Sequence, residues 1–262
     1  MKTILAPALA PLPETSGYCP HCNKTHRLGS GRGYEIARRL IQWLTGSRTI
    51  ALYARNDRGQ TTPEDPTLAT DYLWGAARGK MFGVMECLRP DGSVLTLYAF
   101  SGQYNGRWLV DGWVPPLFDV DEFITVTGDT EKEIKRLTEE LAAYGKGHPE
   151  KTILRQRRRL LSKELTAKIH NLYRLHNFNG QSASLPEAFT GSGGIPTGTG
   201  DCCAPKLLDY AARNNLQPLG MAEFYIGRAT KSGSYRHGDF SAPCAKRCSP
   251  ILGFLLCGLA DN

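Results

Sequence analysis

The sequence predicts an α/β fold with one main domain, arranged as a three-layer α/β/α sandwich with an inserted helical hairpin. Two strand-like runs flank a Pro-Asp-Gly turn in the middle of the chain, and segments with helical spacing of apolar residues precede and follow them. A composition of 41% hydrophobic and 22% charged residues, with 28 glycines and 16 prolines, is typical of a loop-rich globular protein. A chain of 262 residues is long enough to bury a sizeable core.

The chain divides into residues 1–30, a Pro-rich lead with a Cys/His knuckle, and residues 31–262, the α/β domain that carries a basic helical insert. A helix is expected at 34–44, where Ile36, Leu40, Ile41 and Leu44 recur at helical spacing. Residues 55–70 are polar and contain proline, so they predict a loop. The hairpin strands are expected at 81–87 and 94–100.

Two helices are expected to form an insert at residues 129–178. Asp129 is a candidate N-cap, and the apolar residues that follow it are Ile134, Leu137, Leu141 and Tyr144, at spacings of 3, 4 and 3. Pro149 ends this helix, and a second amphipathic helix is expected at 151–175. Beyond the insert, a Gly-rich loop at 190–200 leads to a helix at 204–214, a strand at 219–225 and a terminal helix at 249–259.

The charge and hydropathy patterns favour an RNA partner and exclude a membrane span. No apolar run approaches the roughly 18 to 20 residues that a membrane span needs. Residues 1–13 hold three prolines and one basic residue, so we expect neither a signal peptide nor a membrane anchor there. We therefore expect a cytoplasmic protein. The net charge is +7 with a sequence pI near 9.0. Residues 146–174 contain nine basic and two acidic residues, so the net charge of this segment is +7, equal to that of the whole chain.

A helix with such a basic face suits a phosphate backbone, although a solvated helix face is the alternative. The residues that we expect to bind nucleic acid are Arg155, Arg157, Arg158, Arg159, Lys206 and Arg236.

Eight cysteines in a chain without a secretion signal indicate metal binding or thiol chemistry rather than disulfides. Cys202 and Cys203 begin one predicted helix, and Cys244 and Cys248 begin the next, after an intervening strand. Because a helix N-terminus stabilises thiolates, we expect zinc to be bound there by Cys202, Cys244 and Cys248, with His237 as a further ligand. The sequence leaves open which of the adjacent Cys202 and Cys203 is the ligand.

A second metal site is expected at Cys19, Cys22 and His26, which by themselves lack a fourth ligand. Two alternatives remain open: a structural zinc in which Cys19 and Cys22 join the Cys244 and Cys248 pair, and buried thiols that bind no metal. Cys257, like Cys87, lies in an apolar run and is expected in the core.

The order of hairpin, cysteine at a helix start, strand and Pro-Cys motif at the next helix start resembles the zinc-dependent nucleobase and cytidine deaminase superfamily. Two features differ. The second motif is Cys-x-x-x-Cys, one residue longer than in that superfamily. Ala204 or Pro205 stands where its proton-transferring glutamate follows the first ligand. Glu223 and Asp201 are the candidate replacements. We favour Glu223, because an apolar strand should desolvate its carboxylate and raise its pKa; a salt bridge to Arg228 or Arg236 is the alternative.

Several separate motifs between residues 75 and 258 resemble the N-terminal extension of a group of bacterial RluA-type pseudouridine synthases. These motifs are Gly79-Lys-Met-Phe-Gly-Val84, Tyr98-Ala-Phe-Ser-Gly102, Pro115-Pro-Leu-Phe-Asp119, Gly198-Thr-Gly-Asp-Cys202, Ala204-Pro-Lys-Leu-Leu208, Ala222-Glu-Phe224, Arg236-His-Gly-Asp-Phe240, Cys244 and Lys246-Arg-Cys248. The resemblance implies an RNA context and a connection with RNA modification enzymes. The catalytic Arg-Leu-Asp segment of the synthases is missing, so we do not expect this chain to form pseudouridine.

Two functions follow as expectations. The first is a zinc-dependent, deaminase-like hydrolase that acts on a base in RNA or in a nucleotide, with Glu223 moving protons. The second is a non-catalytic, zinc-stabilised RNA-binding module associated with RNA modification.

Overall fold

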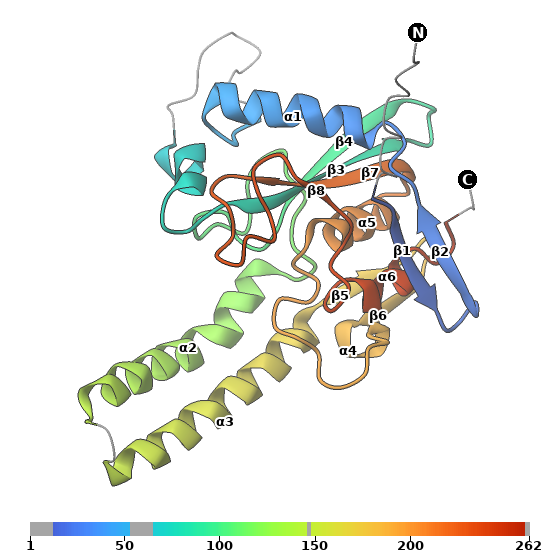
Figure 1. Cartoon of the computed structure of the whole chain (residues 1–262). Coiled ribbons are helices and arrows are strands. Elements are labelled where there is room, and N and C mark those ends of the chain that lie inside the picture. Colours follow the sequence, from blue (N-terminus) through green and yellow to red (C-terminus); the bar gives the residue numbers. More distant parts are fainter. Residues whose placement is uncertain (1–12, 53–64, 146–147, 260–262) are drawn as a thin grey trace, which may run out of the picture.

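A computed structural model describes residues 13–52, 65–145 and 148–259 of the protein. A four-stranded antiparallel sheet forms its centre (Figure 1). The strands lie in the order β4-β3-β7-β8. Their bounds are β3 Lys80–Leu88, β4 Val94–Phe100, β7 Gln217–Ile226 and β8 Phe240–Ser241. The predicted hairpin is confirmed, since β3 pairs with β4 and Gly92 takes a φ of +82° in the turn between them.

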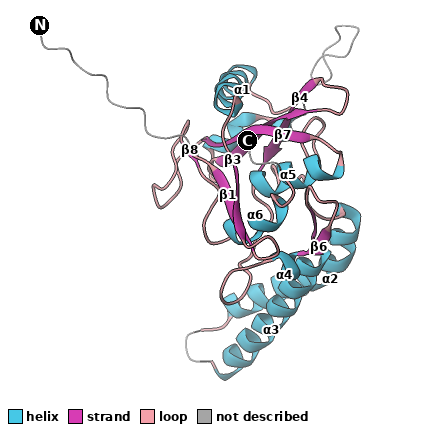
Figure 2. Ribbon diagram, turned by 90° about the vertical axis from the view of Figure 1, so that its right-hand side faces the viewer, coloured by secondary structure: helices cyan, strands magenta, loops and turns pink. Residues whose placement is uncertain are grey.

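Helices cover both faces of this sheet (Figures 1 and 2). Helix α1 (Gly33–Ser47) packs on one face, over an apolar cluster that includes Leu40, Leu44 and Phe82. Helix α5 (Cys203–Arg213) packs on the other face, and α6 (Ser249–Leu255) lies against α5 within the second apolar cluster. The protein is therefore mixed α/β, with a helix layer on each side of the sheet.

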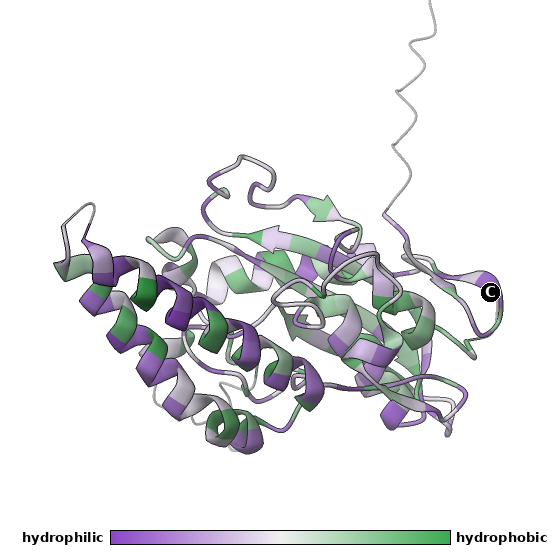
Figure 3. Ribbon diagram, turned by 90° about the horizontal axis from the view of Figure 1, so that it is seen from below, coloured by the Kyte–Doolittle hydropathy of each residue, from purple (hydrophilic) through white to green (hydrophobic). Residues whose placement is uncertain are grey.

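The predicted helical insert is an antiparallel pair, α2 (Val120–Ala143) and α3 (Pro149–Leu172), that projects from the body of the molecule (Figure 1). Hydrophilic and hydrophobic segments alternate along both helices in Figure 3, as expected of amphipathic helices. The predicted start at 129 is wrong. Helix α2 begins at Val120 because the Asp119 carboxylate accepts a hydrogen bond from the backbone N–H of Glu122 at 2.8 Å and caps the helix there.

Smaller elements complete the fold. The knuckle is a hairpin of β1 (Thr15–Cys19) and β2 (Lys24–Leu28), and a second hairpin of β5 (Arg174–His176) and β6 (Ser182–Ser184) precedes the short α4 (Leu185–Ala188). The predicted loop at 55–70 contains one 3₁₀ helix, Pro66–Leu68, and a second, Thr70–Trp74, begins at its last residue. Residues 55–64, like the lead at 1–12, lie outside the described residues. No helix in the described part of the chain combines the length and apolar character that crossing a bilayer requires.

Candidate metal sites

Three cysteines meet where α5 and α6 begin. The sulfur atoms of Cys202, Cys244 and Cys248 all lie within 4.8 Å of one another and could hold a metal ion. Cys202 is the N-cap of α5 and Cys248 that of α6. The backbone N–H of Cys248 donates to the carbonyl oxygen of Cys244 at 3.1 Å, so a helical turn brings these two thiols together. That turn accommodates the extra residue of the Cys-x-x-x-Cys motif.

The three thiols shift one another's pKa values. Hydrogen bonds with Cys202 and Cys248 lower the pKa of the Cys244 thiol, contact with Cys244 raises that of Cys202, and contacts with Cys202 and Cys244 raise that of Cys248. Cys248 is buried, whereas Cys202 and Cys244 are partly exposed. Soft thiolates held this close suit a thiophilic cation, and a cation between them would replace their protons.

The structure also decides between the adjacent cysteines. Cys203 points into the core, where its thiol lies 3.5 Å from the carbonyl oxygen of Met81 and 3.7 Å from that of Ala99. Burial raises its pKa well above the ordinary value. Cys202 is therefore the member of the pair that belongs to the metal group.

Glu223 reaches the first turn of α5 from strand β7. Its carboxylate accepts a hydrogen bond from the backbone N–H of Ala204 at 2.9 Å, and only 6% of the residue is exposed. Burial raises its pKa to about 7, which agrees with the prediction from its apolar strand. The alternative of a salt bridge to Arg228 or Arg236 is wrong, because the described residues include no such ion pair and Arg228 is exposed.

The second candidate carboxylate, Asp201, lies next to Cys202 and accepts a hydrogen bond from the hydroxyl of Tyr173 at 2.6 Å. Burial raises its pKa, while the hydrogen bond from Tyr173 and the charge of Lys206 oppose the shift. The backbone carbonyl of Asp201 accepts a hydrogen bond from the N–H of Gly102, which joins the start of α5 to the end of β4. Through these hydrogen bonds, Asp201 connects the start of α5, where Cys202 lies, to Gly102 and to Tyr173.

Lys206 lies beneath the same turn rather than on the surface. Its ammonium group donates to the carbonyl oxygens of Phe100 and Gly102, both at 3.0 Å, and only 1% of the residue is exposed. Burial lowers its pKa to about 8. The prediction that Lys206 contacts nucleic acid is therefore wrong, because α5 turns this side chain inward to hold the strand end.

His237 is also placed differently from its prediction. Its Nδ1 accepts a hydrogen bond from the backbone N–H of Gly227 at 3.4 Å, and its ring packs against that of Trp74 with 5.1 Å between centroids. The described metal groups do not include it. The loop after β7 folds toward Trp74, which carries His237 away from the cysteines.

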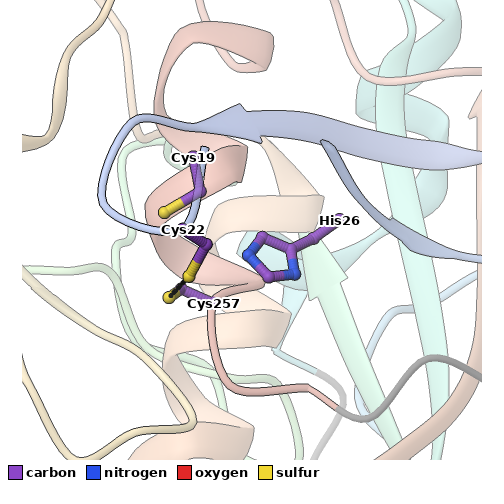
Figure 4. Close-up of side chains that lie close together, drawn as sticks. All are labelled: Cys19, Cys22, His26 and Cys257. Atoms are coloured by element: carbon purple, nitrogen blue, oxygen red, sulfur yellow. Dashed lines mark hydrogen bonds between the residues drawn. The ribbon is translucent and has the colours of Figure 1, made fainter. Parts of the chain in front are cut away.

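A separate group of four side chains that could hold a metal ion joins the two ends of the described chain. Cys19, Cys22 and His26 come from the β1–β2 hairpin, and Cys257 follows α6; their ligand atoms lie within 4.8 Å of one another (Figure 4). The sulfurs of Cys22 and Cys257 lie 3.2 Å apart. The group includes the three ligands expected from the sequence. Cys257 is buried, as expected, but it also belongs to this group, which the sequence did not indicate. The alternative in which Cys19 and Cys22 join Cys244 and Cys248 is also wrong, because the four cysteines fall into two groups.

The basic residues of α3 lie on the projecting pair of helices. Arg155, Arg157 and Arg159 are exposed, and Arg158 is half-buried. Arg157 forms an ion pair with Glu133 of α2 at 2.8 Å. Arg236 is exposed on the loop before β8. These arginines are accessible to a large anionic partner, and their role in nucleic-acid binding stays a prediction.

In comparisons with protein-family models, curated proteins and solved structures, the chain matches none of them.

Proposed function

We propose that the protein is a zinc-dependent, deaminase-like hydrolase that acts on a base in RNA or in a nucleotide. The observation that supports this most is the combination of three cysteine sulfurs within 4.8 Å of one another and a buried carboxylate, Glu223, at the first turn of the helix that carries Cys202. Catalytic zinc sites use three protein ligands and leave one position for water or substrate, which fits Cys202, Cys244 and Cys248.

Zinc would be held by the three thiolates and, when bound, would supply Lewis-acid activation of water for attack on the base. Glu223 would move the protons. A carboxyl group with a pKa of about 7 can both accept and release a proton near neutral pH, which is the property that general acid–base catalysis needs. The N–H of Ala204 orients the carboxylate by binding one of its oxygens.

The order of elements supports the same class. A hairpin (β3–β4), a helix that begins at a ligand (α5), a strand (β7) and a second helix that begins at a ligand (α6) follow the order expected of a deaminase-like fold. The difference is that the carboxylate comes from β7 rather than from α5. We place the protein in the cytoplasm, where its thiols would stay reduced.

The test is the Glu223→Gln variant, assayed for ammonia release from cytosine-, adenine- and guanine-containing nucleotides and RNA. Turnover should fall at least 100-fold while the zinc content is unchanged, because general acid–base catalysis contributes roughly that factor. Glu86→Gln is the matched control: Glu86 is also a buried glutamate of the sheet, but it pairs with Arg32 at 3.1 Å. Full activity in the Glu223 variant, or loss of zinc from it, would contradict the proposal.

A second candidate function is a non-catalytic, zinc-stabilised RNA-binding module that accompanies RNA modification enzymes. The exposed basic face of α3 favours it, as does the resemblance to synthase extensions. The fourth zinc ligand at the Cys202 group separates the two functions. A water there would favour a hydrolase, whereas a fourth protein ligand would favour the binding module; the zinc-edge X-ray absorption of Cys202→Ser is subtracted from that of the wild type to isolate this group.

A further inference from the structure

We propose that Cys19, Cys22, His26 and Cys257 form a closed, four-ligand zinc site that fixes helix α6 and thereby controls metal binding by the three-cysteine group. The second half of this inference rests on the proposed function, since it takes Cys202, Cys244 and Cys248 as a metal site. The first half stands on the geometry of the four ligands alone.

The ligand set matches a structural zinc. Three sulfurs and one imidazole within 4.8 Å give a Cys₃His set, and four protein ligands leave no position for a substrate. Cys19, His26 and Cys257 are buried, and Cys22 lies on the exposed turn between the strands. Figure 4 shows the three thiols and the imidazole converging from the hairpin and from the chain beyond α6.

The turn between β1 and β2 brings the backbone N–H groups of His21 and Cys22 to the sulfur of Cys19. Zinc binds the thiolate form of cysteine, and backbone donors of this kind stabilise that form.

Helix α6 connects the two metal groups. It runs for seven residues, from Ser249 to Leu255; Cys248 is its N-cap, and Cys257 follows its end by two residues. At a rise of about 1.5 Å per residue, the helix is only about 10 Å long, so a shift at one end moves the other.

The hairpin and α6 also pack without room for a side chain. A Cβ added at Gly253 would overlap the carbonyl oxygen of Tyr18, and one added at Gly17 would overlap the backbone N of Gly253. The backbones of β1 and α6 are therefore in direct contact. The position of α6 follows that of the hairpin that carries Cys19 and Cys22.

In this arrangement, metal binding by the three-cysteine group depends on the four-ligand site, but the four-ligand site does not depend on the three-cysteine group. Loss of the four-ligand site would release Cys257 and loosen the hairpin against α6, which would displace Cys248. Loss of Cys202 would remove a ligand on α5 and leave the hairpin, α6 and Cys257 in place.

The test counts zinc per chain by elemental analysis in the full-length protein, purified under reducing conditions. We expect two zinc ions in the wild type, one in Cys202→Ser, and fewer than one in Cys257→Ser. Cys87→Ser is the matched control, since Cys87 is a buried cysteine in β3 outside both groups, and it should keep two. Two zinc ions in Cys257→Ser would overturn the site. A single zinc there, bound by the three cysteines with wild-type affinity, would overturn the dependence.

A second measurement covers the case in which Cys257→Ser does not fold. The wild type is titrated with a chelator and followed by native mass spectrometry, and free thiols are alkylated in the species that retains one zinc. We expect Cys202 and Cys244 to be modified and Cys19 and Cys22 to be protected. The reverse pattern, or a Cys22–Cys257 disulfide in place of metal, would overturn the inference. Neither measurement uses turnover, so an inactive enzyme with two zinc ions would refute only the proposed function.

Discussion

The Glu223 carboxylate accepts a hydrogen bond of 2.9 Å from the backbone N–H of Ala204, although the two residues belong to β7 and α5. Ala204 occupies the position where a deaminase-like motif carries its glutamate. The carboxylate therefore reaches the first turn of the ligand-bearing helix from the neighbouring strand. In the proposed function, the proton-transferring carboxylate would therefore act from a strand rather than from the helix.

The buried Glu223 should make the stability of the metal-free protein depend on pH. Burial raises its pKa from 4.5 to about 7, so its stabilising contribution is complete below pH 4.5 and is lost as the pH rises through 7. Relative to the wild type, Glu223→Gln should gain up to about 3 kcal/mol between pH 5 and pH 8, because it carries no charge to bury. Urea unfolding of chelator-treated protein at both pH values measures this gain. An equal difference between the two proteins at pH 5 and pH 8 would show that the carboxyl is not desolvated.

The adjacent cysteines should respond differently to removal of their sulfurs. Cys202→Ala should lose one metal ion, because its thiol belongs to the three-cysteine group. Cys203→Ala should keep its metal and lose about 1–2 kcal/mol of unfolding free energy, because its thiol fills a buried space beside the sheet. Zinc analysis and urea unfolding of both variants make the comparison, and metal loss only from Cys203→Ala would reverse the assignment.

Two glycines in helices should give opposite results when replaced by alanine. In α6, Gly253→Ala should cost about 3 kcal/mol or more and reduce zinc binding, since the new methyl group would meet the backbone of Tyr18. In α1, Gly46 has nothing within 4 Å of an added Cβ, so Gly46→Ala should stabilise the protein by about 0.5–1 kcal/mol. Thermal or urea unfolding distinguishes the two, and a stable Gly253→Ala protein with full zinc content would refute the tight contact between α6 and β1.

The exposed arginines of α3 should control RNA binding and its salt dependence. Arg155 and Arg159 lie one helical turn apart on the projecting pair of helices. Replacing both by alanine should weaken binding of all RNA sequences alike and reduce the slope of log K against log salt by about 1.5, which corresponds to two phosphate contacts. Fluorescence anisotropy over a salt series measures the slope. Arg48→Ala is the control, since Arg48 is also exposed but pairs with Asp71; an equal effect there would indicate a non-specific charge effect.

Much of the fold can be predicted from the sequence, because the elements concerned depend on patterns among residues close together along the chain. The turn at 89–92, the apolar spacing of α1 and the helix starts at Cys202 and Cys248 are all local signals. The start of α2 is not predictable from the sequence, because Asp119 and Asp129 are both suitable N-caps, and only the hydrogen bond with Glu122 shows that Asp119 is the one used. The short strands β5 and β6, three residues each, carry too little pattern to be recognised.

The candidate sites divide in the same way. Spacing in the sequence predicted that Cys19, Cys22 and His26 lie together and that Cys244 pairs with Cys248, because the first three share a hairpin and the last two share a turn. Cys257 is 235 residues from Cys22 along the chain, and no local pattern connects them. The choice of Cys202 over Cys203, the inward turn of Lys206 and the position of His237 beside Trp74 also depend on which elements pack together. The sequence by itself determined which cysteines and histidines are candidate metal ligands and where the helices that carry Cys202 and Cys248 begin, since both depend on residues close together along the chain. Only the tertiary structure decided which ligands meet, because that depends on packing between segments far apart in the chain.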